Sequence, residues 1–282
     1  MKNQTLLFVM NEATPDSEVR TYAALAATKN ARLICVILAE IPTFPIGGYG
    51  ALPYGGATDV PLDWMKRTAD ARKALEARSD TLEALLQSEA VSGEVHTVHC
   101  VPSDMRVAVA RRALVADVAG IATNLRSDDE VFRAAAYSVL FDAPIPLVLN
   151  TPLPVQPARV FVAWNTEVPA SRAIHSALPH LIAADEVVIG SFDPQATEFR
   201  DGEDPGADLA KWLSHHGCSV TVNQYPCGGS PVSTCIQRRA AEIGADLVVM
   251  GAFGRSRLQE FVFGSTTRVM LDQTTTPVLM AH

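Results

Sequence analysis

Short apolar runs alternate along the chain with longer stretches in which apolar residues recur at helical spacing. Apolar runs of about four to eight residues predict buried strands, and their alternation with helices is typical of a parallel sheet wound with helices. The first half predicts strands at 5–10, 32–38, 95–101, 118–122 and 146–149, and helices at 16–29, 63–89, 103–115 and 128–141. The second half repeats this order, with strands at 159–164, 186–192, 219–225, 246–250 and 278–281, and helices at 171–183, 208–216, 231–243 and 264–272.

The two halves also share a short sequence pattern. Ala116-Asp-Val-Ala-Gly-Ile in the first half matches Ala245-Asp-Leu-Val-Val-Met in the second, so the repeat is 129 residues long (245 − 116 = 129). A repeat of this length indicates two domains and not a solenoid of short units. We therefore predict domains at 1–150 and 158–282, joined by the proline-rich linker 151–157, which favours a stiff, extended chain.

Composition narrows the class of partner and the compartment. The chain of 282 residues is 48% hydrophobic, with a net charge of −8 and a pI of about 5.4. An acidic chain argues against nucleic acid or an anionic membrane as the main partner, since both attract basic surfaces. With no membrane-length apolar run, no signal-peptide core and five cysteines without a C-x-x-C pair, we expect a cytoplasmic protein with reduced thiols.

Three glycines near the end of the chain form the best candidate site. Gly251 and Gly254 follow the apolar run 246–250, and after nine intervening residues comes Gly264-Ser265-Thr266, where a helix is predicted to begin. We expect Gly251 to let a ligand approach the backbone and Gly254 to take the positive φ of a tight turn. A helix start offers unpaired N–H groups to an anion, and Arg255 adds positive charge. The alternative is that these glycines only serve turns.

Residues 228–282 resemble the C-terminal half of a universal stress protein domain, whose nucleotide signature G-x2-G-x9-G-S/T is matched at every fixed position. The resemblance implies two tandem doubly wound α/β domains of the adenine-nucleotide alpha hydrolase type. Because single domains of the family pair through their last strands, it also implies an intramolecular pseudo-dimer joined along 146–149 and 278–281. A further homodimer is left open. The implied function is a stress-response regulator that binds an adenine nucleotide, ATP with or without Mg, and contacts a regulatory protein whose identity the sequence does not give.

The resemblance also places the remaining site residues. The segment after the first strand of the second half, Ala163-Trp164-Asn165, is expected to contact the base and sugar, with Phe192 as a second wall and Met250 at the end of the glycine-bearing strand. Two residues depart from the family pattern, since Asn165 replaces an aspartate and Phe253 replaces a frequent histidine. Trp164 either stacks on a base or fills the core. The predicted ligand-binding set is Ala163, Trp164, Asn165, Phe192, Met250, Gly251, Gly254, Arg255, Gly264, Ser265 and Thr266, with no catalytic and no metal-ligating residue.

The same repeat predicts that the first half has lost this cradle. Gly251, Gly254, Gly264 and Ser265 correspond to Ala122, Leu125, Ala135 and Ala136. A leucine does not easily adopt positive φ, and its side chain fills space that a phosphate or ribose needs. We therefore expect one nucleotide per chain, in the second half. The first half is then either a structural partner or the holder of something apolar.

Other patterns favour ordinary structural roles. His96 and His99 are three apart in a strand and point to opposite faces, and no P-loop, nucleophile elbow or zinc-protease motif occurs. The segment 42–61 is a long Gly/Pro/Tyr-rich loop, either a flap or an interface arm, and the helix after it covers its own sheet or meets another chain. We expect no enzyme beyond incidental ATP hydrolysis. The alternative function is a scaffold, or a carrier of an apolar ligand, that binds no nucleotide.

Overall fold

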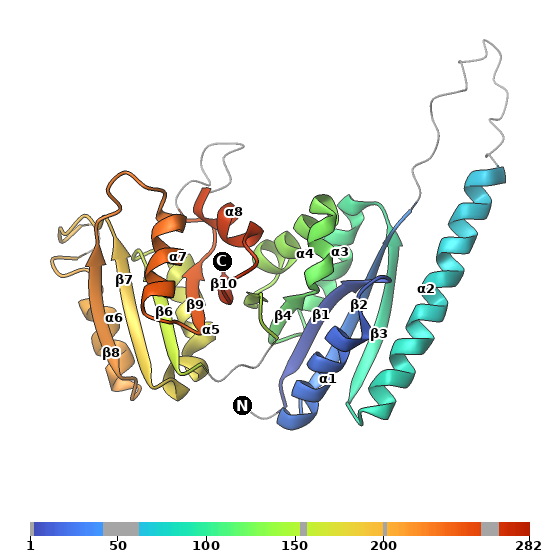
Figure 1. Ribbon diagram of the computed structural model, residues 1–282, viewed down its shortest axis with the longest axis horizontal. Coiled ribbons are helices and arrows are strands. Elements are labelled where there is room, and N and C mark those ends of the chain that lie inside the picture. Colours follow the sequence, from blue (N-terminus) through green and yellow to red (C-terminus); the bar gives the residue numbers. More distant parts are fainter. Residues whose placement is uncertain (1–2, 42–61, 153–156, 200–201, 255–264) are drawn as a thin grey trace, which may run out of the picture.

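The computed structural model describes residues 3–41, 62–152, 157–199, 202–254 and 265–282. Their strands form one ten-stranded sheet in the order β3-β2-β1-β4-β5-β10-β9-β6-β7-β8, with helices on both faces (Figure 1). The N-terminal half contains β1 (Thr5–Asn11), α1 (Asp16–Lys29), β2 (Arg32–Glu40), α2 (Leu62–Ser88), β3 (Gly93–Cys100), α3 (Pro102–Ala113), β4 (Val118–Ile121), the 3₁₀ helix η1 (Thr123–Ser127), α4 (Asp129–Asp142) and β5 (Leu147–Leu149). The C-terminal half contains β6 (Arg159–Trp164), α5 (Val168–Ala183), β7 (Glu186–Phe192), α6 (Ala207–His215), β8 (Val220–Tyr225), α7 (Val232–Glu242), β9 (Leu247–Gly251), α8 (Ser265–Asp272) and β10 (Val278–Ala281).

The two halves have the same strand order. In the N-terminal half the order is β3-β2-β1-β4-β5, and in the C-terminal half it is β8-β7-β6-β9-β10, read from the opposite edge of the sheet. All neighbouring strands within a half are parallel. The predicted fold of two doubly wound parallel units is confirmed.

The strand sequences explain why each unit is covered on both faces. Leu7, Phe8, Val9 and Met10 of β1 are all fully buried, as expected for a parallel strand between two helix layers. Right-handed crossovers place α1 and α2 on one face of the N-terminal half and α3 and α4 on the other. By the same rule, α5 and α6 share one face of the C-terminal half, and α7 and α8 share the opposite face.

The last strands of the two halves join the sheet. β5 and β10 run antiparallel, with Val278 opposite Leu149 and Met280 opposite Leu147. All side chains in this pairing are buried, at 2% exposure or less, and burying one such side chain contributes roughly 1.5–3 kcal/mol. Polar contacts reinforce the seam, because Arg133 of α4 forms an ion pair with Asp272 of α8 at 2.6 Å. The predicted intramolecular pseudo-dimer, paired through its last strands, is confirmed.

The structure shows how α2 lies on its own sheet. Its C-terminal turns cover the sheet through Leu75, Leu82, Leu85 and Leu86, all buried. Its N-terminal end extends past the sheet, with Leu62 83% exposed (Figure 1). The interpretation of a helix that covers its own sheet therefore holds for the C-terminal turns. The predicted loop at 42–61 lies outside the described residues.

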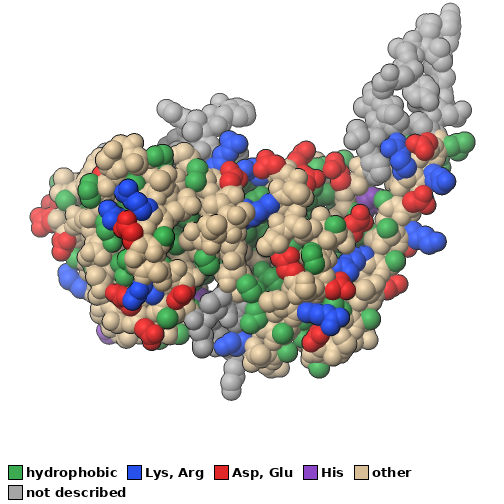
Figure 2. All heavy atoms as spheres, viewed as in Figure 1, with side chains coloured by type: hydrophobic (Ala, Val, Ile, Leu, Met, Phe, Trp, Pro, Cys, Tyr) green, Lys and Arg blue, Asp and Glu red, His purple; other side chains and the backbone are tan. Residues whose placement is uncertain are grey.

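Two further features concern the surface and the local structure. On the face shown in Figure 2, acidic and basic side chains are interspersed and not gathered by sign. No helix in the described ranges is long and apolar enough to cross a membrane.

The 3₁₀ helix η1 was not predicted, because a single tight turn after a strand leaves no periodic signal in the sequence.

Candidate functional site

A cavity of ≈ 510 Å³ opens at the carboxyl ends of β6, β7 and β9, beneath α7 and α8. β6 and β9 are neighbours at the point where the strand order reverses, which is where open α/β sheets bind ligands. The described residues that line it are Ala163, Trp164, Asn165, Glu167, Phe192, Val232, Ile236, Met250, Gly251, Phe253, Gly254, Ser265, Thr266 and Thr267.

The predicted ligand-binding residues meet in this cavity. Every member of the set that the structure describes is in its lining, although the set comes from four separate stretches of sequence. Arg255 and Gly264 lie outside the described residues. Sequence reasoning missed Glu167, Val232, Ile236 and Thr267 as lining residues, and it treated Phe253 only as a departure from a family pattern.

The side of the cavity toward β7 and α7 is apolar. Phe192 ends β7 and stacks on Tyr225, with ring centroids 5.6 Å apart. Val232 and Ile236 lie one helical turn apart on α7 and face the cavity together. Their spacing was readable in the sequence as an apolar stripe, but the stripe alone does not say whether it covers the sheet or a ligand. A flat aromatic group fits such a wall by burial and stacking.

The side toward β9 and α8 is polar. Ser265 and Thr266 form the start of α8 and present hydroxyl groups. The first N–H groups of a helix have no partner within the helix, and the helix dipole favours an anion there. Thr267 has a different part, because its buried Oγ1 accepts a hydrogen bond from the Phe253 N–H at 2.9 Å. This bond ties the first turn of α8 to the loop after β9.

Gly251 and Gly254 do not have the roles that the sequence predicts for them. Neither Gly251 nor Gly254 has positive φ; that conformation falls on Phe253, at φ 54. A Cβ on Gly251 would collide with the backbone of Pro169 and Ala170, so this glycine makes room for the first turn of α5 and not for a ligand. A Cβ on Gly254 would collide with the carboxylate of Glu167. The prediction of a positive φ at Gly254 is wrong. Close packing against the backbone of α5 requires a glycine at 251, whereas at Gly254 the neighbouring group is the far end of the Glu167 side chain.

The turn after β6 brings a carboxylate to the cavity. Asn165 Oδ1 accepts a hydrogen bond from the Glu167 N–H at 3.3 Å, which closes a tight turn ahead of α5. Glu167 lies beside Gly254 and is the N-cap residue of α5. The described lining residues include no Lys or Arg. A cation near Glu167 would reduce the repulsion between this carboxylate and a ligand with negative charges.

Trp164 separates the main cavity from its neighbours. It lines the main cavity and two further hollows of ≈ 540 and ≈ 200 Å³. Its side chain is half-buried. The structure thus gives Trp164 a surface toward the cavity, whereas a residue that only fills the core has none.

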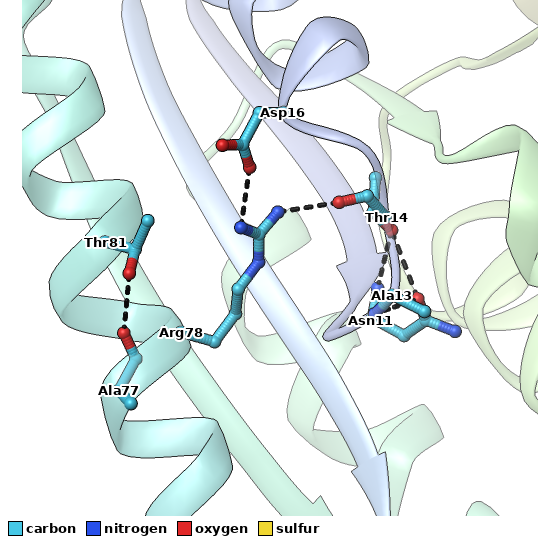
Figure 3. A network of polar contacts seen from close by, with 7 residues as sticks. All are labelled: Asn11, Ala13, Thr14, Asp16, Ala77, Arg78 and Thr81. Carbon is cyan, nitrogen blue, oxygen red and sulfur yellow. Dashed lines mark hydrogen bonds and ion pairs between the residues drawn. The ribbon is translucent and has the colours of Figure 1, made fainter.

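The equivalent crevice in the N-terminal half is occupied by that half's own side chains. Asn11 Oδ1 accepts hydrogen bonds from the Ala13 N–H at 3.1 Å and from Asn124 Nδ2 at 2.7 Å. Thr14, buried, donates from Oγ1 to Asn124 Oδ1 at 2.9 Å. Arg78 reaches across from α2, with an ion pair to Asp16 and a hydrogen bond to the Thr14 carbonyl oxygen, both at 2.6 Å (Figure 3).

The positions that correspond to the motif also differ in the N-terminal half. Leu125, which aligns with Gly254, is fully buried. Ala135 and Ala136 lie inside α4 and not at its start. That helix begins instead at Asp129, and the carboxylate of its N-cap residue Asp128 accepts a hydrogen bond from the Val131 N–H at 3.2 Å. Acidic residues fill its first turn, and their negative charge opposes an anion at this helix start.

The remaining candidate groups are metal-ligating side chains and cysteines. Among the described residues, no group of three or more His, Cys, Asp or Glu side chains could hold a metal ion. All five cysteines are free. Cys227 and Cys235 do meet, and burial, with their mutual hydrogen bond, raises the pKa of the Cys227 thiol to about 12. A thiol with a raised pKa carries little reactive thiolate near neutral pH.

The sequence and fold have known counterparts. Residues 218–282 match the model of the universal stress protein family. A universal stress protein from Archaeoglobus fulgidus DSM 4304 superposes with a TM-score of 0.61 at 14% identity, covering 98% of this chain and 97% of its own. A protein of unknown function from Pseudomonas aeruginosa PAO1 superposes with a TM-score of 0.60 at 15% identity, covering 99% and 92%. No curated protein matches the sequence. At these identities the two structures show a shared fold along nearly the whole length.

Proposed function

We propose that this chain, a member of the universal stress protein family, is a stress-response regulator that binds an adenine nucleotide in its C-terminal half. Its membership rests on residues 218–282 and on a fold shared along nearly its whole length. The observation that carries the proposal is the convergence of the strand-end residues and the start of α8 on one cavity of ≈ 510 Å³. That volume lies within the range of about 300–1,000 Å³ typical of small-molecule sites. ATP, carried as its magnesium complex, is the ligand that we propose.

The two sides of the cavity suit the two ends of a nucleotide. The apolar wall of Phe192, Val232 and Ile236 would hold the adenine ring. The hydroxyl groups of Ser265 and Thr266, with the N–H groups at the start of α8, would receive the phosphates. This division places the base and the phosphates on opposite sides of the strand ends.

The chemistry of Asn165, Glu167 and Ser265 fits a magnesium ion that accompanies the phosphates. Their amide, carboxylate and hydroxyl oxygens are the hard donors that Mg²⁺ prefers, and Mg²⁺ is usually bound by one or two carboxylates together with substrate phosphates. The ion would neutralise phosphate charge beside Glu167. Without it, the carboxylate would repel the nucleotide.

We propose binding without programmed turnover. The described lining residues include no His, Cys or Lys, and their one carboxylate, Glu167, is assigned to the proposed magnesium ion. A bound nucleotide would instead shift the population between two conformations or assemblies for which it has different affinity. Contacts with a regulatory protein partner would change with that shift. Slow hydrolysis of ATP would be incidental.

The apolar lining also supports a second candidate. Phe192, Val232, Ile236 and Phe253 together would suit an apolar ligand, and Phe253 replaces a polar residue frequent in the family. In that case the chain is a carrier or scaffold and the motif glycines serve packing alone. Lipid that copurifies with the protein would favour this function, and copurified nucleotide would favour the first.

A matched pair of substitutions tests the proposed site. Val232 lines the cavity and is 37% exposed, whereas Val269 on α8 is absent from the lining and is 40% exposed. Val232→Trp should fill the apolar wall and abolish Mg-ATP binding in calorimetric titration, while Val269→Trp should bind like the unaltered protein. Equal affinity in the two variants would show that the nucleotide binds elsewhere.

A further inference from the structure

Phe253 belongs both to the cavity and to the interface between the halves. It lines the main cavity and an adjoining hollow of ≈ 450 Å³, yet it is only 6% exposed. Its ring packs on two aromatic residues of α4, with centroids 4.6 Å from Phe141 and 5.9 Å from Tyr137. Since α4 is part of the N-terminal half, residues from outside the C-terminal half support one wall of its cavity.

The backbone of Phe253 has a conformation that its surroundings must stabilise. Its φ of 54 lies in the left-handed region, which is unfavourable for a residue with a Cβ and persists where the surroundings hold it. Within the C-terminal half, its N–H donates to Thr267 Oγ1 at 2.9 Å. The preceding residue is fixed as well, because the Ala252 N–H donates to the Ala281 carbonyl oxygen at 2.8 Å. These bonds hold the backbone, while the α4 contacts hold the ring.

The interface keeps α4 in place over this loop. Arg126, at the end of η1, donates to Asn150 Oδ1 at 2.9 Å and also hydrogen-bonds to the Leu271 carbonyl oxygen of α8. Tyr137 and Phe141 contact each other edge to face at 5.6 Å, so the two rings form one surface against Phe253. A change in the position of α4 therefore reaches the cavity through the Phe253 ring.

We infer that Phe141 and Tyr137 are positioning residues for the C-terminal cavity, and that the N-terminal half completes the site through Phe253. The inference rests on the proposed function in that the ligand is taken to be the nucleotide. The N-terminal half then has a definite part in binding although its own crevice is occupied by side chains. Because coupling of this kind is reciprocal, a bound ligand will in turn strengthen the contact between Phe253 and α4.

Three single substitutions in the N-terminal half test the inference. Phe141→Leu removes the ring that packs on Phe253, and Phe141→Tyr keeps it. The matched control is Phe8→Leu, which removes a ring from the α1 face of the sheet, where Phe8 stacks on Tyr22 at 4.0 Å. Each full-length variant is titrated with Mg-ATP well below its thermal midpoint. Amide hydrogen exchange of the ligand-free protein is followed in residues 247–254 and 265–272.

We expect Phe141→Leu to weaken Mg-ATP binding about fivefold or more, in the range typical of coupled sites, and to speed exchange in both segments. Phe141→Tyr and Phe8→Leu should stay close to the unaltered protein in affinity and in the exchange of these segments. Identical behaviour of Phe141→Leu and Phe8→Leu would overturn the inference. If the unaltered protein binds no nucleotide, the proposed function fails, and the exchange comparison alone decides whether α4 positions the loop.

Discussion

The carboxyl ends of the strands enclose a cavity in the C-terminal half, whereas in the N-terminal half the same place is occupied by side chains, although both halves have the same strand order. Asn11 and Asn165 stand at the end of the first strand of each half. Each accepts a hydrogen bond from the N–H two residues further on and so closes a turn, but Asn11 Oδ1 also accepts one from Asn124. The comparison teaches that a doubly wound sheet keeps its frame whether its strand ends enclose a cavity or are filled by side chains.

A few side chains and one helix start account for the difference. In the C-terminal half, α8 begins at Ser265, and the hydroxyl-bearing residues Ser265 and Thr266 line the cavity. In the N-terminal half, α4 begins several residues earlier relative to its strand, behind the carboxylate of Asp128. The first start suits an anion and the second repels one. Side chains at the strand ends and charge at the helix start, and not the fold, therefore separate the two halves.

The largest expected effect concerns Leu125, which is fully buried where the other half has Gly254. Leu125→Ala should lower the free energy of unfolding by about 2–5 kcal/mol, because it leaves a cavity in a packed core. Urea unfolding measures this loss. The variant should still bind one Mg-ATP per chain, and a second bound nucleotide would show that Leu125 alone had closed the N-terminal crevice.

The reciprocal change, Gly254→Leu, makes the C-terminal half resemble the N-terminal half. Its Cβ would collide with the Glu167 carboxylate, and the rest of the side chain would enter the cavity. We expect Mg-ATP affinity to fall about 100-fold, equivalent to roughly 2.7 kcal/mol, in calorimetric titration. Circular dichroism should show an unchanged fold. Retained affinity in a folded variant would mean that the phosphates do not pass Gly254.

A smaller effect is expected at Arg78, which ties α2 to the turn after β1. Its side chain is 15% exposed and bonds to Asp16 and to the Thr14 carbonyl oxygen. Arg78→Met should cost about 1–2 kcal/mol of unfolding free energy, as expected for the loss of charge-assisted hydrogen bonds. Nucleotide affinity should not change. A large loss of affinity would place Arg78 in the binding machinery and contradict the division between the halves.

The smallest effect is expected at Glu167. With the charge removed in Glu167→Gln, metal-free ATP should bind about fivefold more tightly, a gain of roughly 1 kcal/mol, because the carboxylate no longer repels the phosphates. Titrations with Mg-ATP and with ATP in EDTA give the ratio of the two affinities. The ratio should fall toward one. An unchanged ratio would show that Glu167 does not act on the phosphates or on their metal ion.

Much of the fold could be read from periodicity. The predicted bounds of α1, β6, β7 and β10 agree with the structure at both ends, because each is a clear apolar run or stripe between polar residues. The predicted and observed bounds differ where the apolar periodicity is weak. Helix α5, for example, begins at Val168 and not at 171, because Pro169 fits a first helical turn. The pairing of the two halves through their last strands was predicted from the family resemblance and not from periodicity.

The site could be predicted only in part. Residues adjacent to strand ends were found, since the strand pattern and the motif fix their place. Val232 and Ile236 were missed because packing brings α7 over β7, and no local pattern distinguishes a ligand wall from a core stripe. The polar network around Asn11 was missed for a similar reason, as Arg78 and Asn124 are distant from it in sequence. The positive φ at Phe253 follows from tertiary contacts that propensity does not encode.

Calorimetric titration of the full-length protein with Mg-ATP, with AMP and GTP for comparison, tests most directly the claim that one half binds and the other does not. The proposed difference between the halves predicts one site per chain, selective for adenine. Two sites per chain, or no binding of any nucleotide, would contradict it.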